Sequence, residues 1–204
     1  MKVTKIYSYD KGKKILKAAR KSIELCVRNP DFARNEILEE LAEFNQRHGV
    51  FVTIRYMPTM AVRGKIGFPM PALTVCDSVV EAAVAAACDD PLFVPLSEKE
   101  LDEVIVEVAL LSEPSPMKGG AERVKEISIG RDGAMARYGT RQGIVLPSEA
   151  VERGLDAEGL LNEACGRAGM PKGYWNQPNV NIYKFETQVF KEETPNGMIV
   201  EGKF

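Results

Sequence analysis

The chain has few of the residues that metal-dependent and nucleophilic catalysis use. It contains one histidine and four cysteines among 204 residues. The cysteines are far apart in sequence and form no C-x-x-C pair, so no zinc site and no other bound metal or cofactor is predicted. Cys76 and Cys88 fall in one predicted helix, about 18 Å apart along its axis, which is beyond disulfide reach. We therefore expect reduced thiols, as in a cytoplasmic protein.

Long apolar runs and an excess of charge of one sign are also missing. No apolar run approaches the roughly 20 residues that a membrane-spanning helix needs, and the first five residues begin no apolar signal segment. Membrane and secretory classes are thus excluded, and a cytoplasmic location is expected. Lys and Arg number 27 against 29 Asp and Glu, for a net charge of -2. This near balance argues against a protein that mainly binds phosphate backbones.

The single histidine, His48, is the only residue that could complete a Ser-His-Asp or Cys-His pair. It lies in Gln46-Arg47-His48-Gly49, between a helical pattern and a strand pattern. A histidine followed by glycine at that place is typical of a helix C-terminus, where both complement the exposed carbonyl groups. We prefer this structural interpretation to a catalytic one, because no partner lies nearby at a recognisable spacing.

The first half of the chain alternates helical and strand periodicity. Ile15, Ala19, Ile23 and Val27 recur at helical spacing up to Asn29-Pro30. A capping box of Ser97 and Glu100 predicts a short helix before the last strand. The pattern predicts helices at 13–28, 37–44 and 74–89, and strands at 51–57, 62–68 and 104–111.

The second half repeats a similar order after the Pro/Gly/Ser-rich residues 112–121. Asp156 is expected to cap a helix that ends at Gly169. Trp175 is expected to fill the core. The pattern predicts strands at 125–130, 134–138, 143–146, 180–190 and 198–200, with one helix from Pro147 and another after Asp156.

Two similar halves, about 1–111 and 122–204, are therefore predicted to form a single domain of the α+β class. The halves are expected to place their strands in one curved or barrel-like sheet, with helices packed outside and a cleft between unequal parts. This order suggests an internal repeat, although the halves share little sequence identity.

Several runs of residues carry a resemblance to a known family. They are Phe51–Ile54, Arg63–Gly67, Asp90–Leu96, Gly143–Pro147, Glu152–Asp156, Ala168–Pro171 with Trp175, and Val180–Phe185. In this order they resemble the AMMECR family, named for the AMME syndrome candidate protein of vertebrates, over nearly the whole chain. The resemblance implies a compact α+β protein with two unequal parts and a cleft. It settles no biochemical activity.

One departure from the family pattern bears on function. The family usually has Arg-Gly-Cys-Ile-Gly-Thr where this chain has Arg63-Gly64-Lys65-Ile66-Gly67-Phe68. A nucleophile or metal ligand at the motif cysteine therefore cannot act at position 65. Cys76, eleven residues later, is not assumed to replace it.

The candidate ligand site follows from strand geometry. In a strand over 62–68, Val62, Gly64, Ile66 and Phe68 share one face, and Arg63, Lys65 and Gly67 share the other. Two cations beside a glycine suit a small anion. Arg141 precedes the corresponding strand of the second half and is included in the site. The alternative is a solvated strand face whose glycines serve packing.

Three function classes stay open from the sequence. The first is a regulatory or scaffold protein whose cleft binds a small anionic ligand or a partner peptide. The second is an enzyme or enzyme subunit that works with Memo-like or radical-SAM partners, which the family resemblance permits, with Arg63 or Lys65 holding an anionic substrate. The third is nucleic-acid binding, which would require a basic stripe. The neighbouring carboxylates Asp89 and Asp90 could serve acid-base catalysis, but their position after a helical pattern favours a structural role at a helix end.

Overall fold

The computed structural model describes residues 4–202, which form two compact units. The larger unit contains Lys5–Leu110 and the segment that begins at Gln188, and the smaller unit contains Leu111–Thr187. The predicted α+β class is confirmed, because both units combine antiparallel strands with helices. The compact units differ from the two expected sequence halves, because the segment after Gln188 belongs with the first part of the chain. The expected curvature of the antiparallel sheet is confirmed as well, whereas the internal repeat and the cleft stay predictions.

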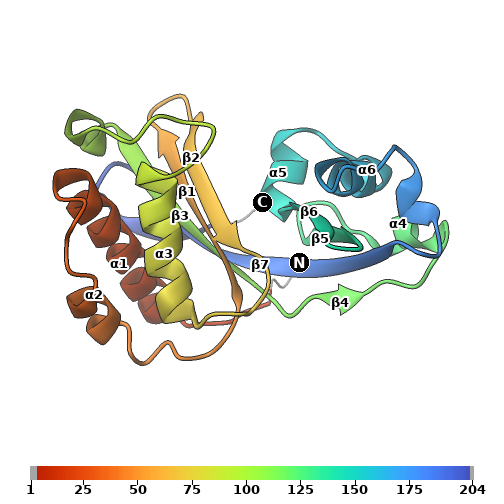
Figure 1. Cartoon of the computed structure of the whole chain (residues 1–204), viewed down its shortest axis with the longest axis horizontal. Coiled ribbons are helices and arrows are strands. Elements are labelled where there is room, and N and C mark those ends of the chain that lie inside the picture. Colours follow the sequence, from red (N-terminus) through yellow and green to blue (C-terminus); the bar gives the residue numbers. More distant parts are fainter. Residues whose placement is uncertain (1–3, 203–204) are drawn as a thin grey trace. The chain divides into compact units, whose positions relative to one another are not determined.

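The larger unit is a sheet with helices on one face (Figure 1). Its strands follow the order β2-β1-β3-β7, and β8 pairs with the end of β7. Every second residue of β1 and β3 points to the side of the sheet that the helices cover and is buried in the core there. The elements are α1 (Tyr9–Arg28), α2 (Asn35–Glu40), β1 (Gly49–Tyr56), β2 (Val62–Phe68), α3 (Val75–Cys88), the 3-10 helix η1 (Glu98–Asp102), β3 (Val104–Leu111), β7 (Asn181–Glu192) and β8 (Ile199–Gly202).

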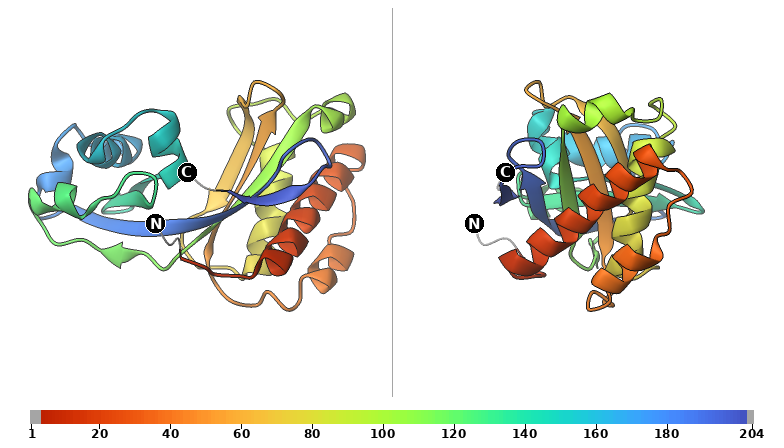
Figure 2. Two further views of the ribbon diagram at one scale, coloured as in Figure 1. Left: turned by 180° about the vertical axis from the view of Figure 1, so that it is seen from behind. Right: turned by 90° about the vertical axis from the view of Figure 1, so that its left-hand side faces the viewer.

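Helices α1 and α3 pack against each other and cover the same side of these strands (Figures 1 and 2). Ser8 caps α1 and Thr74 caps α3, because each side chain accepts a hydrogen bond from a backbone N–H of the first turn. The small side chains Ala82, Ala83, Ala86 and Ala87 let α3 approach the sheet closely. Because α3 lies so close to β2, a strand residue that faces this helix has little room for a side chain.

The smaller unit is built on the first part of β7, which pairs with β5 on one side and β4 on the other. Helix α6 packs on β5 and β6. Trp175 is buried in this core and donates a hydrogen bond from Nε1 to Asn162 Oδ1 at 3.1 Å, which confirms its expected role. The elements are β4 (Ser115–Pro116), α4 (Glu122–Glu126), β5 (Asp132–Tyr138), β6 (Arg141–Val145), α5 (Pro147–Glu152), α6 (Ala157–Arg167) and the 3-10 helix η2 (Tyr174–Asn176).

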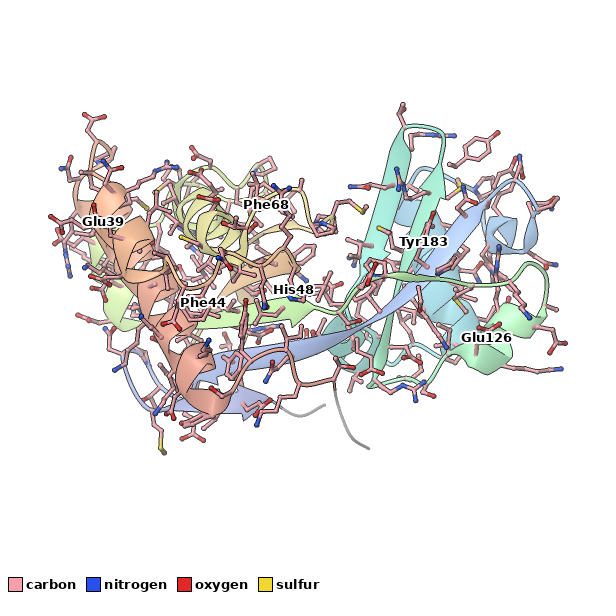
Figure 3. The ribbon with its side chains drawn as sticks, turned by 90° about the horizontal axis from the view of Figure 1, so that it is seen from below. Glu39, Phe44, His48, Phe68, Glu126 and Tyr183 are labelled. Atoms are coloured by element: carbon pink, nitrogen blue, oxygen red, sulfur yellow. The ribbon has the colours of Figure 1, made fainter. Side chains whose placement is uncertain are left out.

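Two local predictions are wrong. The expected strand at 125–130 is the helix α4 followed by a turn, because Glu122–Glu126 is rich in helix formers and its Arg123 is buried against backbone carbonyls. The second helix ends at Glu40, so His48 is not a helix C-terminal residue. His48 directly precedes β1 (Figure 3). The Tyr7 ring packs edge-on against the rings of His48 and Phe44.

Candidate functional site

Strand β2 carries four of the five predicted site residues, and its alternation agrees with the expected faces. Gly64 faces α3 so closely that a Cβ there would lie 2.1 Å from the Ala86 carbonyl oxygen. Ile66 packs against the helix-side core. Arg63, Lys65 and Gly67 therefore point to the opposite face of the sheet, which we call the basic face of β2.

Arg63 is buried and bonded on all sides of its guanidinium. Nε donates to Glu100 Oε1 at 2.7 Å, and Nη1 donates to the Val94 carbonyl at 2.9 Å. Nη2 lies 3.3 Å from both the Pro95 carbonyl and Glu100 Oε2, and the guanidinium carbon lies 6.0 Å from the Phe93 ring centroid. Arg63 thus fixes the loop before η1, and we assign it a positioning role.

The carboxylate of Glu100 is held in its charged form. Burial acts to raise its pKa, but hydrogen bonds from Arg63, Tyr56 and Ser97 outweigh that effect and lower the pKa to about 2. The Ser97 backbone N–H donates to Glu100 Oε2 at 2.8 Å, which confirms the predicted capping box. One side chain therefore caps η1 and neutralises the buried arginine.

Lys65 is half-buried and lies at the edge of the sheet. Its backbone N–H donates to Asp90 Oδ2 at 2.7 Å, so a carboxylate satisfies the open side of the edge strand. Its ammonium lies 5.6 Å from the centroid of the Phe51 ring. Phe51 is also opposite Gly67, where a Cβ would approach the ring to 2.3 Å. Gly67 therefore makes room for Phe51, as the packing alternative expected.

Further charged residues share this face of the sheet. Arg55 of β1 and Glu107 of β3 are both buried, and Nε of Arg55 lies 3.6 Å from Oε2 of Glu107. Together with Arg63, Lys65 and Glu100, the group contains three cations and two carboxylates. With the Asp90 carboxylate that accepts a hydrogen bond from the Lys65 backbone N–H, three cations lie beside three carboxylates, and the formal charge is about zero. Sequence reasoning missed Arg55, because it lies within an apolar strand pattern, and it considered Glu107 only with Asp102 and Glu103 as carboxylates at a strand entry.

Arg141 belongs to the smaller unit, where it has local contacts of its own. It is exposed at the start of β6, and Nη1 donates to the Gly169 carbonyl at 3.2 Å. Its guanidinium carbon lies 5.3 Å from the Tyr138 ring centroid. Arg141 and the basic face of β2 thus belong to different compact units.

A second place for a ligand is a pocket of about 250 Å³ in the larger unit. Its floor is the buried ion pair of Arg20 with Glu192, in which Nε lies 3.0 Å from Oε1. Lys17, Lys21 and Glu24 line it from α1, and the Asn196-Gly197 turn lines it from the other side. The α1 side of this pocket could have been found in the sequence, because residues 17, 20, 21 and 24 are spaced so that they share one face of a helix.

Three groups with a possible catalytic use can be compared with the structure. Between residues 4 and 202, no group of three or more His, Cys, Asp or Glu side chains is placed to hold a metal. Asp90 binds backbone N–H groups of Lys65 and Leu92 instead of pairing with Asp89 for acid-base work. Burial raises the pKa of the Cys165 thiol to about 11, which disfavours a nucleophilic thiolate there. In the same part of the chain, no helix combines the length and apolarity required to cross a membrane.

Comparison with known proteins agrees with the resemblance seen in the motifs. The AMMECR1 family model matches residues 16–190. A protein of Thermococcus gammatolerans is 39% identical over 198 residues, covering 92% of this chain and 93% of that protein. A protein of Methanopyrus kandleri is 42% identical over 159 residues, covering 76% and 77%. The crystal structure of an uncharacterised protein from Pyrococcus horikoshii matches with a TM-score of 0.89 at 34% identity, covering 96% of this chain and 98% of that one.

Proposed function

The chain belongs to the AMMECR1 family, and we propose that it is a non-enzymatic regulatory protein that binds a small anionic ligand on the basic face of β2. The observation that carries this proposal is that the half-buried residue Lys65 lies on the same face of the sheet as Arg63, a buried arginine paired with a carboxylate. Lys65 contacts the anion, and Arg63 keeps the neighbouring backbone in place.

The arginine partners of the two carboxylates support an anion and not a cation at this face. Nε of Arg63 lies 2.7 Å from Oε1 of Glu100 and Nε of Arg55 lies 3.6 Å from Oε2 of Glu107, so the negative charge of both carboxylates is already compensated. Binding would use Lys65 as a point charge, since Arg63 has its guanidinium donors directed to Glu100 and to carbonyl groups.

The test is thermal unfolding of the full chain against nucleotides, small carboxylates, inorganic phosphate, divalent metals and short RNA. A ligand at one hundred times its Kd should raise Tm by about 5–10 °C for a protein of this size. We expect the rise with at least one small anion, and we expect Lys65→Glu to abolish it. Lys65 is the position to change because Arg63→Glu would also break a buried ion pair.

The matched control is Lys17→Glu, which makes the same change in charge on an exposed residue of the α1 pocket. A shift lost in Lys17→Glu but kept in Lys65→Glu would move the site to that pocket and contradict the proposal. Response to RNA alone would favour the nucleic-acid class. No response to any anion would leave the basic face of β2 as a structural surface and overturn the proposal.

A further inference from the structure

Two of the four cysteines lie side by side in the larger unit. Cys26 is in the last turn of α1, and Cys88 is the final residue of α3. Their Sγ atoms are 2.8 Å apart although the residues are 62 positions apart in sequence. Sequence spacing alone predicted cysteines with no partner, and the packing of α1 against α3 brings this pair together.

The geometry points to a reversible dithiol/disulfide pair, and we propose that Cys26 and Cys88 form a disulfide when the chain meets a low-molecular-weight disulfide. A disulfide needs its sulfur atoms at about 2.05 Å, so the two Sγ atoms must approach by less than about 1 Å. Because each cysteine ends or nearly ends a helix, the bond would join the C-terminal ends of α1 and α3. The inference is independent of ligand binding at β2.

The two thiols differ in access, which sets the order of the steps. Cys26 is buried, donates from Sγ to the Ile23 carbonyl at 3.3 Å, and has its pKa raised by burial and by the hydrogen bond with Cys88. Cys88 is partly exposed. Cys88 therefore meets the small disulfide first, and Cys26 is the resolving thiol.

The chemistry is thiol–disulfide exchange in two steps. The Cys88 thiolate attacks one sulfur of RS–SR, the S–S bond breaks, and the leaving thiolate takes up a proton as RSH. Cys26 then gives up its proton and attacks the Cys88 sulfur of the mixed disulfide, which releases the second RSH. Two cysteine thiols are oxidised to one disulfide, and one RS–SR is reduced to two RSH.

The position of the pair gives the bond a structural consequence. Cys88 lies two residues before Asp90, whose carboxylate binds the Lys65 backbone N–H. The loop after α3 also returns to the helix, because the Leu96 N–H donates to the Ala87 carbonyl at 2.7 Å. A disulfide at Cys88 would fix the helix end from which this loop leaves. We expect the oxidised larger unit to resist unfolding more than the reduced one.

The test treats the full chain with oxidised glutathione and compares it with the chain kept in reduced glutathione. Thiols counted after denaturation should fall from four to two, with a mass loss of about 2 Da and no glutathione adduct. Cleavage after Lys, Arg and Glu separates Cys76 from Cys88, because Glu81 lies between them. The linked peptide should contain Cys26 and Cys88. Tm should rise by about 9–17 °C, as expected for closing a loop of this length.

Variants separate the intramolecular bond from simple modification. Cys26→Ser should stop at a glutathione adduct on Cys88 with no rise in Tm, and Cys165→Ser, the matched control, should still form the Cys26–Cys88 link. The proposal is overturned if the wild-type chain keeps four thiols. It is equally overturned if the wild-type chain accumulates a glutathione adduct on Cys88. Cys26 lies next to Cys88 in the folded chain and should displace that adduct.

Discussion

Two edge strands, β2 in the larger unit and β6 in the smaller, show the same glycine contact beside very different arginines. A Cβ on Gly64 would lie 2.1 Å from the Ala86 carbonyl oxygen of α3, and a Cβ on Gly143 would lie 2.2 Å from the Ala164 carbonyl oxygen of α6. Next to Gly64, Arg63 is buried and paired with a carboxylate. Arg141, two residues before Gly143, is exposed, donates a hydrogen bond to the Gly169 carbonyl and lies beside the Tyr138 ring.

The two strands show which feature serves packing on a helix and which feature packing does not require. Close packing of a strand on a helix requires a glycine in both places, whatever the chain does with its ligands. A buried arginine is not required by packing, and it is costly unless its charge is compensated. The buried ion pair of Arg63 with Glu100 therefore distinguishes β2 from β6, and it is a reason to place the proposed anion site on β2.

The largest effect should come from removing that carboxylate. Glu100→Gln leaves Arg63 buried without a negative partner, and such a change costs about 3–5 kcal/mol. We expect the free energy of unfolding, measured in urea at pH 7, to fall by about that amount. Glu98→Gln is the control, because Glu98 is exposed and its ion pair with Arg28 at 3.3 Å contributes little.

The same variant has a diagnostic pH dependence. Glu100 has a pKa of about 2 in the folded protein against 4.5 as its ordinary value. A lowered folded pKa gives stability that is present above the ordinary value and is lost as pH falls through the folded pKa. The gap between wild type and Glu100→Gln should therefore narrow from pH 5 toward pH 2. A constant gap across that range would show that the carboxylate charge is unimportant, and the contrast between β2 and β6 would lose its basis.

The glycine contacts should have smaller and nearly equal effects in the two units. Gly64→Ala and Gly143→Ala each push a methyl group into a helix backbone, and overpacking of this kind costs about 1–3 kcal/mol. Thermal unfolding of each variant measures the loss. Gly166→Ala is the control, because a Cβ there meets nothing within 4 Å. A large loss at one glycine alone would mean that the two edge strands are less alike than their contacts indicate.

Sequence reasoning located these strands well and their partners poorly. The bounds of β2 match the predicted 62–68, because alternation and a flanking proline turn are local signals. The pairing of Arg63 with Glu100 joins residues 37 positions apart, and no local pattern marks it. Glu100 was assigned only to a helix cap, which it is, but its second role depends on how β2 and η1 meet in space.

The errors have the same physical origin. Residues 125–130 alternate like a strand, but the chain forms the helix α4 just before and into this range. Arg123 of this helix is buried, and its guanidinium donates hydrogen bonds to the carbonyls of Lys118, Trp175 and Val180. The Cys26–Cys88 contact depends on the packing of two helices. Local propensity predicts the type of most elements, whereas side-chain partners across elements follow from tertiary packing.

The smallest expected effect is at Arg141, and it completes the comparison. Arg141→Ala removes an exposed side chain with one hydrogen bond to the Gly169 carbonyl and a contact with the Tyr138 ring, so stability should change by less than about 0.5 kcal/mol. The same variant should keep any anion-induced rise in Tm that Lys65→Glu removes. If Arg141→Ala instead abolished that rise at unchanged stability, both edge strands would contribute cations to binding. The difference between them would then be one of stability and not of function.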